Sequence, residues 1–309
     1  MSLNRFRFLA ANLRFDDQTT RRIRWPGDRF AAMRDIFVLF NKALGSAVYC
    51  GDWLSFDETL YPGKHKIAFR VFNPGKLHHY GLDFKSINDS ELVFTYQTAV
   101  YAGRPKGPPD EHYVQGVQNV TVKTLGSLGE LQDLRGKNVT CDRLYTSRVL
   151  ADFLWRNKMT ILGTIKNNRR GIPAEFKEGA GRPEGDYMVA YETDSQMSLN
   201  SFLDKKKKGK PNNVLLLTTL EPVMGRTIDD GRDKPAIYKL YDFTMGGTDR
   251  ADQVMAHRST RAKSQRWPML VVYYTLDTAR INAATVRMLQ TMELPVPEGK
   301  EKHPPINQV

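Results

Sequence analysis

One short segment in the middle of the chain, Asn138 to Ser147, limits the fold more than any other stretch. The residues just before Asp142 are of types that favour a buried strand, and Ser147 is a good N-cap for the apolar helical pattern that ends at Trp155. The segment therefore predicts a strand, an acidic residue, a turn and a helix. In open α/β sheets, ligands bind at the carboxyl ends of such strands.

The segments on either side predict strands in an order that completes this unit. Strand patterns are expected over Leu54 to Leu60, Lys66 to Phe72 and Leu92 to Ala99, with short turn-forming connections between them. Connections of this length join antiparallel strands. A further strand is expected at Met159 to Ile165, after the helix. Three antiparallel strands followed by strand, helix and strand is the layout of a ribonuclease H-like α/β core.

The rest of the chain falls into segments of different texture. A short N-terminal helical unit contains a loop rich in arginine around residues 21–24, and residues 167–235 read as an inserted, mostly β subdomain with the basic run Lys205 to Lys210 at a solvated tip. Strand is expected again at Ala236 to Tyr241, then a helix after Gly247 and a buried helix from Pro268. The expected segments are residues 1–50, 51–166, 167–235, 236–292 and a disordered tail over 293–309.

Composition narrows the class of partner. The longest apolar stretch, Trp267 to Met288, is interrupted by charged residues, which excludes a simple membrane span. Two cysteines are too few for a four-ligand zinc site, so no zinc is expected. The excess of 46 Lys and Arg over 34 Asp and Glu gives a formal charge of +12 and favours nucleic acid over membrane as an anionic partner. Ordinary solvated surface charge is the alternative.

Three acids stand out by their positions. Asp57 lies in the first expected strand, Asp142 at the end of the fourth, and Asp249 at the start of the helix after the insertion. In a ribonuclease H-like core these places converge, and converging carboxylates repel one another unless cations neutralise them. Oxygen ligands suit Mg²⁺ or Mn²⁺, and two such ions can support in-line phosphoryl transfer on DNA.

Each acid also has a structural explanation that the sequence leaves open. Asp249 fits the first turn of a helix, where the helix dipole favours a carboxylate, and Asp142 fits a turn after a strand. Asp57 is followed by Glu58. Because successive residues of a strand point to opposite faces, the parity of that strand decides which of the two carboxylates faces the site.

A basic loop precedes the last helix, and it is the expected DNA contact. Arg258, Arg261, Lys263 and Arg266 can bind phosphates, and Trp267 can either stack on an unpaired base or start the helix as a core residue. The adjacent histidines 78 and 79 favour a surface position, and the thiol of residue 141 is expected to be buried and inert.

Several of these segments resemble the piggyBac family of transposases. The similar segments follow one another in order over most of residues 4 to 290. They are Ser55 to Leu60, Asn73 to Lys76 with Tyr80-Gly81, Val139 to Ser147, Leu162 to Pro173, Gly246 to Gln253, and Arg266 to Met269 with Asn282.

The resemblance implies a DDE/DDD transposase with Asp57, Asp142 and Asp249 as its catalytic, metal-binding triad and Asp252 as a neighbouring acid that the family also carries. It implies two Mg²⁺ (or Mn²⁺) ions, nicking and hairpin formation at transposon ends, joining to a TTAA-type target, a nuclear location, and a homodimer as one assembly. Family members also carry an N-terminal extension and a C-terminal cysteine-rich zinc module, and neither is evident here. The alternative is therefore a domesticated or truncated relative that binds DNA or chromatin without cutting it.

Overall fold

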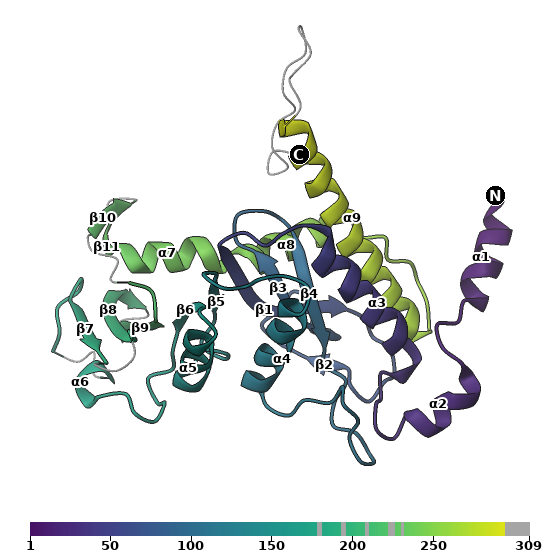
Figure 1. The fold of residues 1–309 in the computed structure, drawn as a ribbon, viewed down its shortest axis with the longest axis horizontal. Helices are drawn as coiled ribbons and strands as arrows, with labels where there is room; N and C mark the ends of the chain where they lie inside the picture. Colours follow the sequence, from purple (N-terminus) through teal and green to yellow (C-terminus); the bar gives the residue numbers. More distant parts are fainter. Residues whose placement is uncertain (178–180, 193–195, 208–209, 222–225, 230–231, 294–309) are drawn as a thin grey trace, which may run out of the picture.

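The computed structural model describes residues 1–177, 181–192, 196–207, 210–221, 226–229 and 232–293 (Figure 1). Its centre is a mixed sheet of nine strands. Three antiparallel strands on one side of this sheet are β1 (Trp53–Pro62), β3 (Tyr80–Asp89) and β4 (Thr95–Val100). On the other side of β1, β5 (Asn138–Cys141) and β6 (Thr160–Thr164) run parallel to it. The order β4-β3-β1-β5-β6 is that of the expected ribonuclease H-like core.

The strands expected between residues 167 and 235 extend this same sheet. β9 (Lys210–Thr218) pairs antiparallel with β6, and β8 (Ser198–Lys207) and β7 (Tyr187–Tyr191) follow outward. A separate pair is formed by β10 (Arg226–Asp229) and β11 (Arg232–Pro235). Residues 208–209 of the expected basic tip and residues 294–309 of the expected disordered tail lie outside the described residues. The domain boundaries given above remain predictions.

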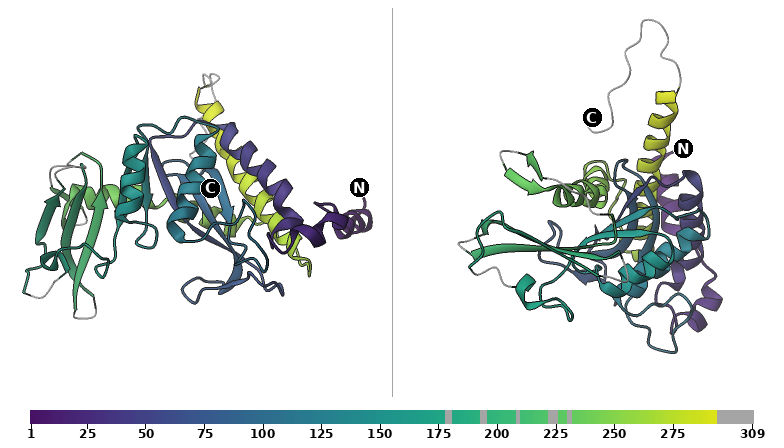
Figure 2. Two further views of the ribbon diagram at one scale, coloured as in Figure 1. Left: turned by 60° about the horizontal axis from the view of Figure 1, so that its bottom comes forward. Right: turned by 60° about the vertical axis from the view of Figure 1, so that its left-hand side comes forward.

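Helices cover both faces of the sheet. On one face α4 (Val117–Gly129) and α5 (Arg148–Arg156) pack against a core that contains Phe56 and Ile87. Ser147 caps α5 as expected, since its Oγ accepts a hydrogen bond from the Leu150 N–H at 3.1 Å. On the other face lie α7 (Ala236–Met245), α8 (Gly247–His257), α9 (Trp267–Glu293) and α3 (Ala31–Ala47). In Figures 1 and 2, α3 and α9 lie side by side.

The N-terminal residues form a helical unit at the end of the molecule opposite β7–β9 (Figures 1 and 2). It contains α1 (Leu3–Asn12) and α2 (Gln18–Arg24), and a one-turn α6 (Ala174–Lys177) lies far from it, near β7. The expected arginine-rich loop is in fact α2. Asp17 starts this helix by accepting the Thr19 N–H at 2.8 Å. Among the described residues, every helix is too short or too polar to cross a membrane.

The strand expected at residues 66–72 was largely wrong, and one strand was missed. Only Val71–Phe72 of the expected strand at residues 66–72 is a strand (β2), while β3 was not expected at all. Leu82 and Phe84 of β3 belong to one core and Ile87 to the other, so apolar residues change face along the strand and break the alternation.

The segment at residues 236–241 is the start of α7, although it was expected to be a strand. Its residues Ile237, Tyr238 and Thr244 are buried, a spacing that fits one helical face over two turns. The aromatic and β-branched residues of this segment were therefore misread as strand formers.

Candidate active site

Asp57 and Asp142 come together at the carboxyl ends of two neighbouring parallel strands. Phe56 of β1 lies opposite Cys141 of β5, so the next residue of each chain segment is an aspartate at the same level of the sheet. The preceding pair on the same face, Ser55 and Thr140, faces α8 and α7, because Thr140 Oγ1 donates to Thr244 Oγ1 at 2.8 Å. This arrangement resolves the open question of parity.

Asp57, rather than Glu58, points toward α8. Thr59, which shares a face with Asp57, donates its hydroxyl to Asp252 Oδ1 of α8 at 2.7 Å. Glu58 points to the opposite face, where its carboxylate accepts a hydrogen bond from Tyr145 Oη at 3.3 Å and pairs with Lys85 at 3.7 Å. The face covered by α8 is therefore the candidate site.

The surroundings of the two strand-end aspartates disfavour their ionised forms. Burial raises the pKa of Asp57 to about 7, and the nearby Asp142 carboxylate adds to the rise. Burial also raises the pKa of Asp142, while the backbone N–H groups of Leu144 and Tyr145, which donate to its Oδ1, act in the opposite direction. A divalent cation between the two carboxylates would favour their ionised forms.

The acids of α8 occupy two different environments. Asp252 is half-buried, and burial raises its pKa to about 6 with a further contribution from Asp249. Asp249 lies exposed in the first turn of α8. Within the described ranges, no three His, Cys, Asp or Glu side chains lie close enough to hold a metal ion. The oxygen donors suit Mg²⁺ or Mn²⁺, and of the three triad residues Asp57 and Asp142 are the pair brought to one place.

Close contact with the sheet fixes the position of α8. A Cβ added to Gly247 would lie 2.3 Å from Ser55 Oγ and 2.5 Å from the Asp89 carbonyl oxygen. The next residue, Thr248, accepts a hydrogen bond from Asn88 Nδ2 at 2.8 Å. Sequence reasoning treated this glycine only as a break between elements, but its lack of a side chain lets the acidic helix approach β1.

Two residues that sequence reasoning missed lie at this site. Lys76 donates its Nζ to the carbonyl oxygen of Glu58 at 3.4 Å, and its charge lowers the pKa of both Asp57 and Asp252. Tyr241 of α7 hydrogen-bonds with Thr164 through its hydroxyl at 3.2 Å, and burial raises its pKa, with Asp142 adding to the effect. For Lys76, the only signal in the sequence was the adjacent Asn73-Pro-Gly turn. Tyr241 was missed because its segment was expected to be a strand rather than a helix.

The basic loop between α8 and α9 is held in place by one buried carboxylate. Asp277 of α9 accepts hydrogen bonds at 2.7 Å from Tyr61 Oη, Ser259 Oγ and the Thr260 N–H. The predicted DNA-contacting residues Arg258, Arg261 and Lys263 are exposed on this loop. The loop is therefore a fixed, positively charged edge next to α8.

Arg266 and Trp267, the other two residues predicted to contact DNA, already make contacts within the protein. Arg266 donates to the carbonyl oxygens of Ala11, at 2.7 Å, and Leu13, and so caps the C-terminal end of α1. The Trp267 ring lies 5.3 Å from that of Phe69 and 5.8 Å from that of Phe30, in agreement with the core alternative. Their roles in binding DNA stay predictions.

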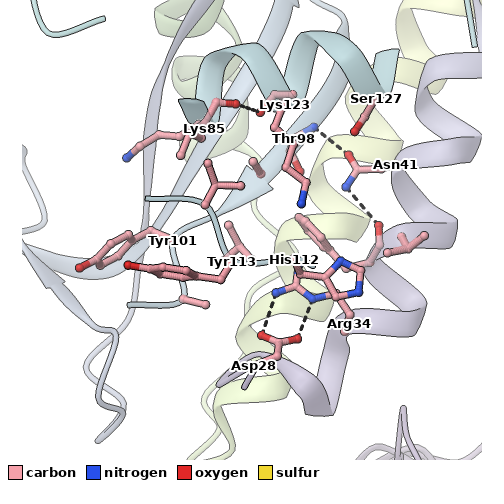
Figure 3. Close-up of a pocket in the computed structure, with 18 of the residues that line it drawn as sticks. Asp28, Arg34, Asn41, Lys85, Thr98, Tyr101, His112, Tyr113, Lys123 and Ser127 are labelled. Atoms are coloured by element: carbon pink, nitrogen blue, oxygen red, sulfur yellow. Dashed lines mark hydrogen bonds and ion pairs between the residues drawn. The ribbon is translucent and has the colours of Figure 1, made fainter. Parts of the chain in front are cut away.

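The residue 141 thiol and a pocket beside α3 lie apart from this chemistry. Cys141 is fully buried, which raises the pKa of its thiol, as an inert core residue requires. The pocket, of about 620 Å³, lies between α3, β4 and α4, and none of the four acids above lines it. In Figure 3 its wall carries the buried ion pair between Asp28 and Arg34, whose Oδ2 and Nε are 2.8 Å apart.

Comparison with known proteins identifies the family and supports the fold. A family model described as Transposase IS4 matches residues 1–284. A cryo-EM structure of a piggyBac transposase synaptic complex with hairpin DNA is similar with a TM-score of 0.83 and 28% identity over 98% of this chain. The chain spans 60% of the length of that protein. The α/β core is thus of the ribonuclease H-like DDE kind, and the chain belongs to the Transposase IS4 family, of the piggyBac type.

Proposed function

We propose that this protein carries out transposase-type phosphoryl transfer on DNA, with Asp57, Asp142 and Asp249 as the catalytic carboxylates. The observation that carries the proposal is the pairing of Asp57 with Asp142 at the ends of β1 and β5, under a helix that presents Asp249 and Asp252. Transposases of this family bind DNA and generally use a divalent metal, and the family match is the second support.

The chain's own residues supply the charge and the geometry for such a reaction. Asp57 and Asp142 would hold Mg²⁺ or Mn²⁺, which when bound supplies Lewis-acid activation of a phosphodiester. Thr59 fixes the Asp252 carboxylate, and the two backbone N–H groups on Asp142 fix its orientation. Lys76 would partly balance the negative charge before the ion and the DNA bind. Asp249, in the first turn of α8, would be the third carboxylate to hold the ion.

The finer steps of the reaction belong to the same proposal. The carboxylates would support nicking at a transposon end, hairpin formation, and joining of the 3′-hydroxyl to a TTAA-type target. Action on chromosomal DNA would place the protein in the nucleus, and synapsis of two ends would call for a homodimer. Arg258, Arg261 and Lys263 would contact phosphates on the approach to the site.

The test is conversion of supercoiled plasmid to nicked circles, and joining of a pre-cut 3′-hydroxyl duplex to that plasmid. With Mg²⁺ the wild type is expected to form both products, and EDTA to abolish them. Removing one ion-binding carboxylate costs several kcal/mol of charge stabilisation, so Asp142→Asn is expected to lose more than about 100-fold in rate. Asp133→Asn removes an exposed carboxylate and serves as the matched control. Equal rates for wild type and Asp142→Asn would exclude this site, and sequenced junctions would test the TTAA target.

A second candidate is a DNA-binding protein that does not cut. It is favoured by the lack of a three-carboxylate cluster within the described ranges. Salt-sensitive DNA binding without any Mg²⁺-dependent product would support this candidate over the first.

A further inference from the structure

A second pocket, of about 510 Å³, lies beside the basic loop. Its walls come from the residues after β1, the residues before β3, the basic loop and the start of α9. We call it the basic pocket, because it is lined by six basic side chains and by no Asp or Glu: Lys64, His65, His78, His79, Arg261 and Lys263. A cavity with only positive and neutral walls attracts an anion.

The walls of the basic pocket are held in fixed positions. Arg261 donates its Nη1 to the carbonyl oxygen of Pro62 at 2.9 Å, which joins the loop to the end of β1. A Cβ on Gly63 would lie 2.4 Å from Leu270 Cδ2, so the backbone packs directly on α9. Asp277 fixes the other end of the loop through its three hydrogen bonds. A pocket with fixed walls binds a ligand without first having to order them.

One wall residue, His65, is half-buried against the basic loop. Burial lowers the pKa of its imidazole, and a hydrogen bond with the Ser264 backbone acts in the opposite direction. The charge available to an anion therefore comes mainly from Lys64, Arg261 and Lys263. The exposed rings of His78 and His79 stand on the neighbouring wall, and Tyr80 and Tyr273 are also among the lining residues.

The position of the basic pocket relates it to the candidate active site. Pro62 follows Asp57 by five residues along β1, which corresponds to about 17 Å in an extended strand. At 3.4 Å of axial rise per nucleotide, a duplex lying along β1 would cover this distance in about five nucleotides, and a duplex at an angle to β1 in fewer. Lys76 comes from the segment that also carries His78 and His79; its Nζ donates to the Glu58 carbonyl oxygen, and its charge lowers the pKa of Asp57 and Asp252. Positive charge thus continues from the acids to the pocket.

We propose that the basic pocket binds one backbone phosphate of the DNA strand, within about five nucleotides of the phosphodiester at the carboxylates. This inference rests on the proposed function. Contacts of Lys, Arg and His to phosphate fix the register of a nucleic acid without reading its sequence. The pocket therefore sets the distance between an anchored phosphate and the reacting one. The larger pocket of Figure 3 is a poorer phosphate site, because Asp28 and Glu130 are among its lining residues.

The first measurement is binding of a fluorescent duplex in EDTA, where cutting cannot occur, by anisotropy at several salt concentrations. Each lost phosphate contact lowers the slope of log affinity against log salt by about 0.9. We expect this decrease, and at least about a fivefold loss of affinity at physiological salt, for Lys64→Gln combined with His79→Gln. Lys42→Gln removes an exposed charge from the larger pocket and is the matched control. An unchanged slope in the pocket variant would overturn the inference.

The second measurement locates the contact along the strand. Single phosphates of the duplex are replaced in turn by neutral methylphosphonates, and each duplex is bound to wild type and to the pocket variant. A coupling is expected at one position, within about five nucleotides of the phosphate whose neutralisation couples to Asp142→Asn. Strictly additive losses at every position would overturn the inference, and an unchanged thermal midpoint would show that the variant is folded.

The two assays separate this inference from the proposed function. If no methylphosphonate position couples to the pocket variant while cutting still depends on Asp142, the phosphate site is excluded and the catalytic proposal stands. If one methylphosphonate position couples to the pocket variant but the wild type does not cut DNA, the phosphate site stands and the catalytic proposal is excluded.

Discussion

At the scale of single residues, the candidate site depends on which of two adjacent carboxylates faces α8. The sequence places Asp57 next to Glu58 and offers no means to choose between them. The choice follows from tertiary contacts, since Thr59 meets Asp252 and Glu58 meets Tyr145 on the other face. Asp142 was easier to predict, because the strand, the turn and the capped helix around it are all local features.

The raised pKa of Asp57 predicts a pH-dependent stability. The ordinary pKa of 3.8 rises to about 7 on folding, so the folded state binds the proton more tightly than the unfolded state. Stability is therefore greatest below pH 4 for this group, and it is lost as the pH rises from about 4 through 7. In EDTA at pH 8, Asp57→Asn is expected to be more stable than wild type by on the order of 2 kcal/mol, after allowing for partial solvent access.

Denaturant unfolding at pH 8 and pH 4.5 measures this difference. The advantage of Asp57→Asn is expected to shrink at the lower pH, and Mg²⁺ at pH 8 is expected to stabilise wild type more than the variant. A variant less stable than wild type at pH 8 would contradict the assigned environment. Asp133→Asn, at an exposed position, is the control for a general loss of charge.

At the scale of elements, α8 carries two acids, and its position depends on the close approach of one of its glycines to the sheet. From the sequence, a helix was expected to begin after the glycine pair that precedes Asp249. Propensity could not show that the second glycine lies against Ser55 and Asp89, because those residues are distant in the chain. The same limit explains α7, whose helical face became evident only from its packing.

Two neighbouring glycines provide a matched test of how α8 is seated. Gly247→Ala places a methyl group 2.3 Å from Ser55 Oγ and 2.5 Å from a backbone oxygen, so either α8 or β3 must shift. We expect a loss of about 1–3 kcal/mol in unfolding free energy and a larger loss of Mg²⁺-dependent nicking. In Gly246→Ala the nearest atom, at 2.7 Å, is the end of the Arg250 side chain, which can move aside at the cost of its hydrogen bond to the Ser90 carbonyl oxygen, so a smaller loss is expected. Equal effects of the two substitutions would argue against this seating.

The basic loop depends on α9 through Asp277. This carboxylate is fully buried and accepts three hydrogen bonds, two of them from the loop. Asp277→Asn puts an amide donor against groups that already donate, at an expected cost of about 1–3 kcal/mol. Weaker DNA binding with the fold retained is the further expectation. Ser259→Ala, which removes one donor only, should have a smaller effect in both anisotropy and thermal unfolding.

At the scale of the whole molecule, the sequence predicted three antiparallel strands followed by further core strands. It did not predict that the strands of the expected subdomain continue the same sheet. Strands between residues 187 and 218 were expected, but their pairing with β6 of the core was not. β9 pairs with β6, and Thr218 Oγ1 donates to the carbonyl oxygen of Ile161 at 2.8 Å. Such pairing brings together segments some 57 residues apart, which local patterns do not specify.

This continuity predicts how the molecule unfolds. Leu216 of β9 is fully buried and packs with Leu162 of β6 and Tyr238 of α7. Because these contacts join the expected subdomain at residues 167–235 to the core, Leu216→Ala is expected to destabilise both, by about 2–5 kcal/mol, in one unfolding transition. Val149→Ala, at an exposed position of α5, is the control with an expected change below about 0.5 kcal/mol. Tryptophan fluorescence and circular dichroism during denaturant unfolding should give coincident curves. Two separate transitions would instead support the subdomain as an independent folding unit, with the carboxylate site on a core that is stable without it.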